Sequence, residues 1–396
     1  MDSDTIVSKY QIKNGKVIPT KIKHLNFPNL KQIQSKMLYY YYINNPNIRS
    51  TLFPALTKIF GQGMSYTFSD CSEITNVSFP ELTSIASKGM EYAYNGCSKI
   101  TSAIFPKLVS VYTRGMDHTF SGCASISDIS FPELKSISDY GLDYAFSGCT
   151  SISGAIEFPK LTSIGYDGLG EAFNGCTNIT SVSFPNLATP GEYSLRGTFT
   201  GCSNIVSISF PKLTTVGIEC MDSTFRYCSN LKTASFPELT TVGENGMYGT
   251  FMGCSSLTTL EFPKLESIDY TGMYNLCYGV GASLTEISFP KLAYIGTGGF
   301  DTAFTSSKIT QISFDLLANV RNDGLKGAFR GCTNLTRVSF PSLTNIGSRM
   351  MSTSTFGGCT NLTEIHFRSD VQSKVESCTG YSSKWGATNA TIYFDL

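Results

Sequence analysis

The chain has 396 residues, and its 30 Lys and Arg residues balance its 30 Asp and Glu residues to a formal net charge of zero. Charged residues make up only 15% of the chain, against about 25% in a typical soluble domain. Without a basic excess, we expect no nucleic-acid binding and no electrostatic docking on anionic membranes. No run of about 18 apolar residues is present, so we also expect no membrane insertion.

Residues 1–24 are predicted to form an N-terminal cap. Asn14 and Gly15 stand between two short apolar stretches, which is a strong signal for a β-hairpin. We expect this hairpin to cover the apolar end of the repeats that follow, because terminal repeats need a cap. The stretch begins with acidic residues and lacks the apolar segment of a secretion signal, so we predict no signal peptide in this chain.

Residues 25–367 consist of about thirteen copies of a repeat of roughly 26 residues. After a Phe, usually followed by Pro, come Leu at three residues, Ile or Val at six, Met or Leu at eleven and Cys at eighteen. A fixed period of this length is typical of a solenoid, in which each coil buries its apolar face against the next. We therefore predict one elongated repeat domain. The Phe residues are Phe27, Phe53, Phe79, Phe105, Phe131, Phe158, Phe184, Phe210, Phe236, Phe262, Phe289, Phe314 and Phe340.

Each coil is predicted to contain a strand, a bend, a helical turn and a second bend. The stretch 181–184 alternates polar and apolar residues, as a half-buried strand does, and Pro185 ends it. The Met-x-x-x-Phe spacing of Met116 and Phe120 indicates a helical or 3₁₀ turn, after which Gly122 offers a left-handed stop. Strands of successive coils should stack in parallel, with a right-handed crossover.

The position two residues after each Phe alternates in charge along the repeats, as in Glu81, Lys107, Glu133 and Lys160. Opposite charges on neighbouring strands attract one another and like charges repel. We therefore interpret this alternation as a device that keeps the coils in register.

Residues 368–396 are predicted to form a C-terminal cap. Ser369 or Asp370 can cap a short helix with apolar residues at helical spacing. The segment 391–394 indicates a final strand, and Trp385 is most simply a buried residue of the cap.

The repeated pattern Phe-Pro-x-Leu-Thr-x-Ile-Gly … Met-x-x-x-Phe-x-Gly-Cys-x-Asn-Leu-Thr is visible in copies such as 184–211 and 314–341. This unit resembles the BspA-like class of leucine-rich repeats, and the resemblance covers nearly the whole chain. It implies a right-handed leucine-rich-repeat solenoid with a role in adhesion or in protein and surface recognition. Members occur in gut bacteria, protists and bacteriophages, and the ending 381–396 is similar to that of gut-bacterial and phage-borne members.

The residues with chemical potential do not assemble into a catalytic pattern. Ten cysteines share one column, and we expect buried free thiols that pack as small apolar groups, since a straight column cannot converge on a metal. His24, His118 and His366 lie in different coils, and no phosphate-binding, hydrolase or dinucleotide motif is present. We predict a non-enzymatic protein without catalytic residues, metal or cofactor. The column is Cys71, Cys97, Cys123, Cys149, Cys176, Cys202, Cys228, Cys254, Cys332 and Cys359.

One column of the repeat is aromatic in five successive copies. Tyr40, Tyr66, Tyr92, His118 and Tyr144 stand two residues after the Met or Leu position. On a helical turn this spacing points away from the core, so we expect an exposed stripe and take these residues as candidate ligand-binding residues. Two interpretations stay open: a stripe that binds a partner through ring faces and edges, or rings that stack on one another to shield the coil edges.

Two other features concern the strands and the loops. A serine precedes most of the repeat's Phe residues, as at Ser288, Ser313 and Ser339, and we expect these hydroxyls simply to be solvated. Irregular coil lengths cluster between residues 277 and 315, where loops that carry function can emerge.

These observations favour a recognition or adhesion scaffold that binds a protein or glycan on a cell or virion surface through one face of the solenoid. Its location would be the cell surface, the extracellular space or a virion. The alternative is a structural component of a bacteriophage virion, such as a tail or fibre appendage that binds a receptor. The sequence carries no signal for the oligomeric state.

Overall fold

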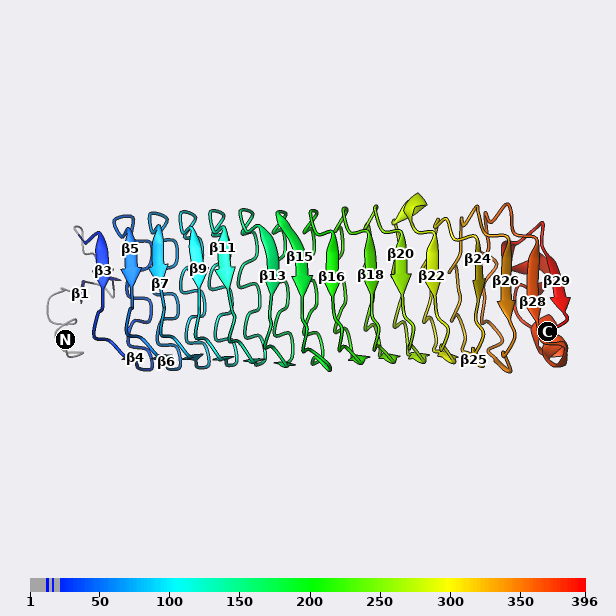
Figure 1. Cartoon of the computed structure of the whole chain (residues 1–396), viewed down its shortest axis with the longest axis horizontal. Coiled ribbons are helices and arrows are strands. Elements are labelled where there is room, and N and C mark those ends of the chain that lie inside the picture. The colour runs from blue at the N-terminus through cyan, green and yellow to red at the C-terminus, as the bar shows by residue number, and fades with distance from the viewer. Residues whose placement is uncertain (1–11, 14–15, 18–21) are drawn as a thin grey trace. The chain divides into compact units, whose positions relative to one another are not determined.

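The computed structural model describes residues 12–13, 16–17 and 22–396, and the chain divides into two compact units, unit 1 (1–185) and unit 2 (186–396). Each unit is a stack of coils with two rows of parallel strands, one of longer and one of two-residue strands (Figure 1). Before the stack, β1 (Ile12–Lys13) and β2 (Lys16–Val17) pair antiparallel. The predicted turn, Asn14 and Gly15, lies outside the described residues, and whether this hairpin covers the first coil stays a prediction.

Unit 1 has seven strands in the long row and six in the short row among the described coils. The short row forms one continuous parallel sheet, with a register of 26 residues from coil to coil, as in Ser110 opposite Ser136, and of 27 residues between β12 and β14. In the long row the paired groups are β3-β5-β7, β9-β11 and β13-β15. The long strands are β3 (His24–Asn26), β5 (Ser50–Leu52), β7 (Asn76–Ser78), β9 (Ser102–Ile104), β11 (Asp128–Ser130), β13 (Gly154–Glu157) and β15 (Ile179–Ser183), and the short strands are β4 (Gln32–Ile33), β6 (Lys58–Ile59), β8 (Ser84–Ile85), β10 (Ser110–Val111), β12 (Ser136–Ile137) and β14 (Ser163–Ile164).

Unit 2 repeats this plan. Its short row is again one six-stranded parallel sheet, and in its long row the groups β18-β20-β22 and β24-β26-β28-β29 are paired. The long strands are β16 (Ser207–Ser209), β18 (Thr233–Ser235), β20 (Thr259–Glu261), β22 (Glu286–Ser288), β24 (Gln311–Ser313), β26 (Arg337–Phe340), β28 (Glu364–Phe367) and β29 (Thr391–Phe394), and the short strands are β17 (Thr215–Val216), β19 (Thr241–Val242), β21 (Ser267–Ile268), β23 (Tyr294–Ile295), β25 (Asn319–Val320) and β27 (Asn345–Ile346). In each unit the predicted parallel solenoid with a repeat of about 26 residues is confirmed.

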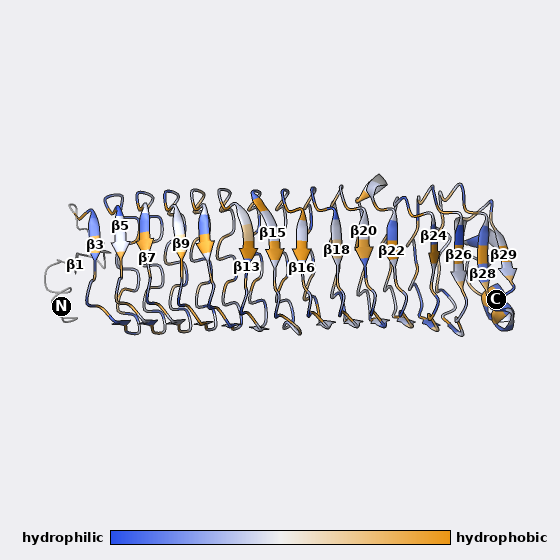
Figure 2. Ribbon diagram, viewed as in Figure 1, coloured by the Kyte–Doolittle hydropathy of each residue, from blue (hydrophilic) through white to orange (hydrophobic). Residues whose placement is uncertain are grey.

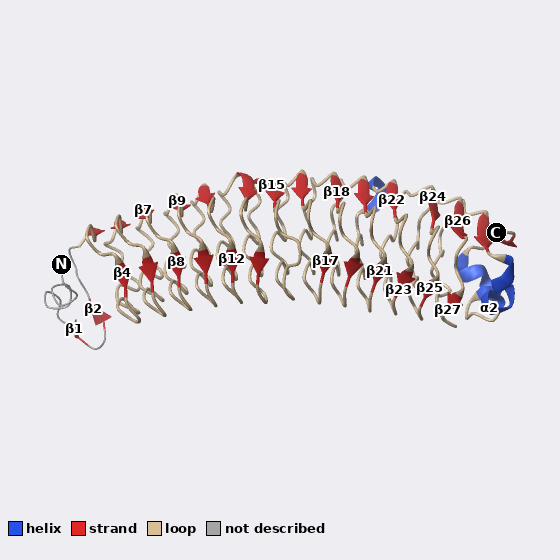
Figure 3. Ribbon diagram, turned by 60° about the horizontal axis from the view of Figure 1, so that its bottom comes forward, coloured by secondary structure: helices blue, strands red, loops and turns tan. Residues whose placement is uncertain are grey.

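The strands form because outward polar and inward apolar residues alternate along them. Figure 2 shows hydrophilic and hydrophobic residues mixed within the same strands, and Figure 3 shows the two strand rows on opposite sides of the coils. The repeat's Phe residues stack along unit 1 with ring centroids 4.9 to 5.9 Å apart. Phe53, Phe79 and Phe105 are almost wholly buried, so a continuous column of rings runs through the core, together with buried Leu, Ile, Met and Cys residues.

The segment predicted as a helical turn is instead a run of successive turns. From Lys88 to Gly96, every second backbone N–H donates to a carbonyl of the next coil at 2.8–3.0 Å, and the N–H groups between them donate three residues back. Lys88, Tyr92 and Gly96 have positive φ angles of 59°, 54° and 72°. A helix would bond each N–H four residues back within the coil. The four-residue spacing therefore reflects a turn repeat, which resembles a helical period in the sequence.

The cysteine column is buried, as predicted, and every cysteine of the chain is free. The thiols do more than fill space, because in nine coils the Sγ lies 3.0–3.3 Å from the carbonyl oxygen of an aromatic residue in the preceding coil. Each such thiol donates to a buried carbonyl that would otherwise cost free energy. Burial raises the pKa of the Cys71 and Cys254 thiols to about 12, so both stay protonated at neutral pH.

The alternating charges pair across neighbouring coils, which confirms the predicted ladder. The ammonium groups of Lys107, Lys160 and Lys264 lie 2.6–2.7 Å from the carboxylates of the preceding coil. All of these side chains are at least two-fifths exposed, so each pair contributes only about 0.2–1 kcal/mol.

The C-terminal end of unit 2 holds most of its helical residues (Figure 3). Val371 is the N-cap of α2 (Gln372–Glu376) and no side chain caps it, so the prediction that Ser369 or Asp370 caps this helix is wrong. Trp385 is fully buried, and its indole N–H donates to the Thr379 carbonyl at 3.0 Å. The strand predicted at 391–394 is present as β29, paired parallel with β28. The other helical turns are η1 (Gly281–Ser283), η2 (Ser369–Val371) and η3 (Tyr381–Gly386).

Candidate functional site

The five predicted aromatic residues form one stacked column in unit 1, the tyrosine ladder: Tyr40, Tyr66, Tyr92, His118 and Tyr144. Successive ring centroids are 4.5, 4.8, 4.4 and 4.7 Å apart, and the planes are within 18° of parallel. The spacing follows the distance between neighbouring coils, because each residue occupies the same turn of its coil. The structure thus brings all five candidate residues together.

Every residue of the ladder adopts a left-handed backbone conformation, with φ between 50° and 57°. Inter-coil hydrogen bonds impose this conformation, as where the Tyr92 N–H donates to the Asp117 carbonyl at 2.8 Å. A residue with a Cβ atom pays about 1–2 kcal/mol for it. Stacked aromatic pairs return about 0.5–1.5 kcal/mol each. The rings therefore offset a backbone cost that a glycine would avoid.

The ladder is less exposed than the sequence suggested. Tyr40 is 40% exposed, whereas Tyr66, Tyr92, His118 and Tyr144 are partly buried. Of the expected exposed stripe only Tyr40 is exposed, and the rings stack on one another, which is the second interpretation that the sequence left open. The edge of Tyr39 also packs against Tyr40, with centroids 4.5 Å apart and planes at 81°. The ladder presents ring edges and hydroxyl groups.

A row of buried acidic side chains, missed in the sequence, lies directly before the ladder residues. Glu91, Asp117 and Asp143 are 7%, 2% and 9% exposed. Burial and the charge of Glu91 raise the pKa of Tyr66 to about 12, so its hydroxyl stays a hydrogen-bond donor across the physiological range. Burial also raises the pKa of Glu91, an effect that Lys88 opposes from 3.7 Å. The signal in the sequence is an acidic residue one position before three of the ladder residues.

His118 is held more tightly than its isolated place in the sequence suggested. Its Nδ1 lies 2.5 Å from Asp117 Oδ1, while Arg114 Nη1 lies 3.0 Å from the other carboxylate oxygen. The Arg114 guanidinium also stacks over Tyr140 at 4.5 Å. His118 is therefore a member of a fixed Asp–Arg–His cluster inside the ladder.

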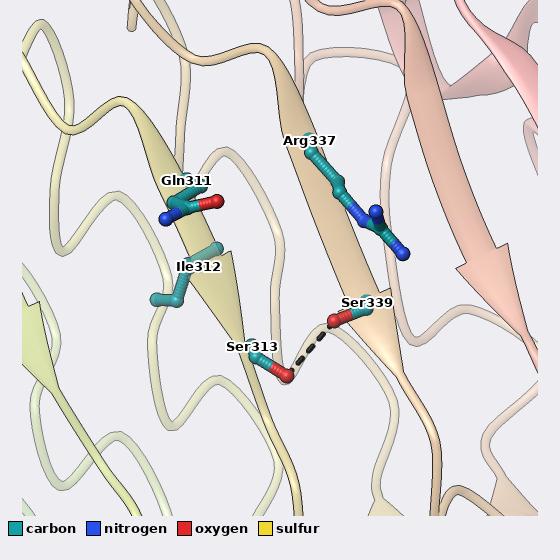
Figure 4. A pocket seen from close by; sticks show the side chains of 5 residues that line it. All are labelled: Gln311, Ile312, Ser313, Arg337 and Ser339. Atoms are coloured by element: carbon teal, nitrogen blue, oxygen red, sulfur yellow. Dashed lines mark hydrogen bonds between the residues drawn. The ribbon is translucent and has the colours of Figure 1, made fainter.

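A second candidate surface lies on the long strands of unit 2, where two shallow hollows share Gln311. Figure 4 shows the side chains that line one of these hollows. Glu286, Gln311 and Arg337 are exposed there, next to Ser313 and Ser339 of the serine column. The central lining residues, from Thr285 to Ser313, belong to the stretch of irregular coils at 277–315, which was the signal available in the sequence. The outer lining residues, such as Glu261 and Arg337, lie in the coils on either side of it. We call the two together the strand-face hollow.

The other chemical groups do not form a further centre. His366 is mostly buried, with Nδ1 2.8 Å from Asp395 and Nε2 3.2 Å from Glu364, so it has acidic neighbours that the sequence reading did not foresee. In the part of the chain that the structure describes, no three His, Cys, Asp or Glu side chains are placed to hold a metal ion. None of the helices described there is long and apolar enough to cross a membrane.

The chain is similar to known leucine-rich repeat proteins in both fold and sequence pattern. The chain is similar to a leucine-rich repeat protein from Bacteroides ovatus, with a TM-score of 0.55 and 18% identity over 98% of this chain and 97% of that one. A leucine rich cell surface protein from Faecalibacterium prausnitzii matches 94% of this chain and 95% of its own length at 16% identity, with a TM-score of 0.39. No curated protein matches the chain. The family model for the BspA type leucine rich repeat region matches residues 31–168, 142–277 and 248–384, and the chain therefore belongs to this family of leucine-rich repeat proteins.

Proposed function

We propose that the protein is a non-enzymatic recognition scaffold that binds a partner protein at a surface through the tyrosine ladder of unit 1. The observation that carries the proposal is the ladder itself, in which five rings of successive coils stack at a position where unit 2 carries Gly, Ser, Asn or Thr. Clustered aromatic side chains are typical of the centres of protein interfaces. The leucine-rich repeat fold is one that supports protein interaction, and it supplies the long, regular surface that such a ladder needs.

A protein partner fits the surroundings of the ladder better than a glycan does. Sugars stack on ring faces, and the inner faces of this ladder are already covered by neighbouring rings. The ladder is flanked by Arg114, which pairs with Asp117 beside His118 and lies over the Tyr140 ring. Tyr and Arg are among the residues that are enriched in the centres of protein interfaces. The virion alternative stays a prediction, which the neighbouring genes would test.

The experiment replaces ladder residues by those that unit 2 carries in the same column, namely Tyr66→Ser and Tyr92→Gly. Ser and Gly keep the left-handed backbone at Ser223 and Gly249 of unit 2, so both variants should fold. Binding is measured on an array of purified extracellular protein domains, with a glycan array in parallel. We expect a protein ligand whose affinity falls about tenfold or more in each variant.

The matched control is Tyr270→Ser, which removes a 54% exposed tyrosine of unit 2 and should leave binding unchanged. Equal binding by the wild-type chain and both ladder variants would remove the ladder from the function. Ligands found only on the glycan array, and lost in the ladder variants, would replace the protein partner by a sugar.

A further inference from the structure

We propose that the strand-face hollow of unit 2 is a binding site for a neutral, hydroxyl-rich oligosaccharide. The site lies in a different unit from the tyrosine ladder and does not depend on it. The hollow has two halves, one over β20 and β22 and the other over β24 and β26. Figure 4 shows the half over β24 and β26, where side chains project from the two neighbouring strands. Five residues line that half: Gln311, Ile312, Ser313, Arg337 and Ser339.

The other half extends the hollow across β20 and β22. Its lining is Thr259, Leu260, Glu261, Thr285, Glu286, Ile287, Ser288, Thr310 and Gln311. Because Gln311 belongs to both halves, the hollow runs over four successive coils of unit 2. At about 4.8 Å per coil, this length suits an extended chain of several units rather than a compact small molecule.

The lining consists of two rows of hydrogen-bonding side chains. The strand register places Thr259 beside Glu286, and Gln311 beside Arg337. The same register places Glu261 beside Ser288 in the second row, with the Ser313 and Ser339 pair continuing it. Hydroxyl, amide, carboxylate and guanidinium groups at regular spacing match a ligand with many hydroxyls, each of which both donates and accepts.

A peptide strand cannot fill the same place by joining the sheet. β22 and β24 do not pair with each other, and their Phe289 and Phe314 rings are 6.4 Å apart, against 5.4 and 5.5 Å for the pairs on either side. An inserted strand would need about 9.6 Å, which is twice the usual strand spacing. The Lys308 N–H also donates directly to the Leu284 carbonyl at 2.8 Å. Recognition in the hollow therefore rests on side chains.

The charges of the hollow favour a neutral ligand. Glu261 and Glu286 lie in one half and Arg337 in the other, and Arg337 is already 3.8 Å from Glu364. An anionic chain would meet the two glutamates, and a cationic chain would meet the arginine. A neutral chain can accept from the guanidinium and donate to both carboxylates, which are the stronger kind of hydrogen bond.

Part of the lining is oriented before any ligand arrives. The Ser339 hydroxyl donates to the Ser313 oxygen at 2.8 Å, and Ser313 in turn donates to Asp315. Ser235 donates to Glu261 at 3.2 Å at the other end. Fixed donors and acceptors reduce the entropy lost on binding, so a shallow site gains affinity without deep burial.

The test is calorimetric titration of the full chain with cellohexaose, xylohexaose, mannohexaose and laminarihexaose. Hexagalacturonate and a chitosan hexamer serve as the anionic and cationic comparisons. We expect at least one neutral hexasaccharide to bind, and to bind more tightly than either charged chain. Glu286→Ala and Gln311→Ala should each weaken that binding about five- to tenfold, the effect of losing one or two hydrogen bonds.

The matched control is Asp128→Ala, which changes an exposed residue of the same strand row in unit 1 and should leave the affinity unchanged. The proposal is overturned by the absence of binding for all four neutral chains, by tighter binding of a charged chain, or by affinity that Glu286→Ala and Gln311→Ala leave intact. The ladder variants Tyr66→Ser and Tyr92→Gly should not alter sugar binding. The two proposals can therefore fail separately.

Discussion

The same backbone position carries aromatic rings in five successive coils of unit 1 and small residues in unit 2. The ladder residues have φ angles of 50–57°, and the corresponding residues of unit 2 have φ angles of 53–61°. The inter-coil hydrogen bond is also the same, since the Tyr66 and Ser223 N–H groups donate to the next coil at 2.9 and 2.8 Å. The coil therefore dictates the backbone while the side chain is free to vary. The unit 2 residues in this column are Gly197, Ser223, Gly249, Asn275, Thr302 and Gly327.

The largest expected effect tests whether the two units share one kind of core. Phe120 in unit 1 and Phe225 in unit 2 are fully buried, and each stacks on a ring of the preceding coil and on a ring of the next coil. Phe120→Ala and Phe225→Ala should each destabilise their own unit by about 3–5 kcal/mol, because the cavity collapses only in part. Hydrogen exchange followed by mass spectrometry would report each unit separately. If the loss of unfolding free energy in one unit were less than about half of the loss in the other, the two cores would not be equivalent.

A smaller effect is expected when the ladder is built into unit 2. Gly249→Tyr should cost about 1–2 kcal/mol, since the left-handed backbone disfavours a Cβ atom. Space is available, because an added Cβ would lie 3.7 Å from Ser223 Oγ. Adding Ser223→Tyr and Asn275→Tyr should return about 0.5–1.5 kcal/mol for each new ring pair.

Gly249→Asn serves as the control, because Asn tolerates the left-handed region and has no ring to stack. Urea unfolding of the single, double and triple variants gives the coupling energies directly. Strictly additive losses over the three sites would mean that stacking does not support the ladder.

A smaller effect is expected when the stability of unit 1 is measured at alkaline pH. The pKa of Tyr66 is raised from 10.0 to about 12 in the folded chain by burial and by the charge of Glu91. The unfolded chain therefore loses this proton first, and the stability of unit 1 should fall as the pH rises from about 10 to about 12. Absorbance at 295 nm would follow the tyrosinate. Tyr66→Phe should weaken this pH dependence, and an unchanged profile would contradict the assignment.

The smallest effect concerns the surface charge ladder, which both units possess. Lys107→Gln in unit 1 and Lys264→Gln in unit 2 should each cost only about 0.2–0.5 kcal/mol, because both ammonium groups are half exposed. The loss should shrink further in 1 M salt, where exposed charges are screened. A cost above about 1 kcal/mol in either unit would give these pairs a larger role than register control.

The repeating features could be predicted from the sequence because they recur in most coils. The buried cysteine column, the Phe column, the charge ladder and strand 391–394 all follow from period and alternation. The turn segment did not, because residues such as Lys88 and Tyr92 give no hint of a positive φ. That conformation is imposed by hydrogen bonds from the neighbouring coil, which is tertiary information.

The candidate surfaces were predicted only in part. The sequence placed the five ladder residues in one column, but it could not show that their faces cover one another or that Asp117 fixes His118. The strand-face hollow was signalled only by irregular coil lengths, since its shape depends on which strands pair. A column of equivalent residues can be predicted from the repeat pattern, whereas the shape of a hollow between unpaired strands needs the three-dimensional structure.

The hydrogen bonds that join successive coils also determine how each unit would respond to force. The bonds from Lys88, Tyr92 and Gly96 all point toward the next coil, so a pull on the chain end loads them one coil at a time. Each detached coil of about 26 residues would release roughly 90 Å of extended chain. The coils of a unit would then unfold one after another, in steps of equal length and at low force, while the remaining coils stay folded.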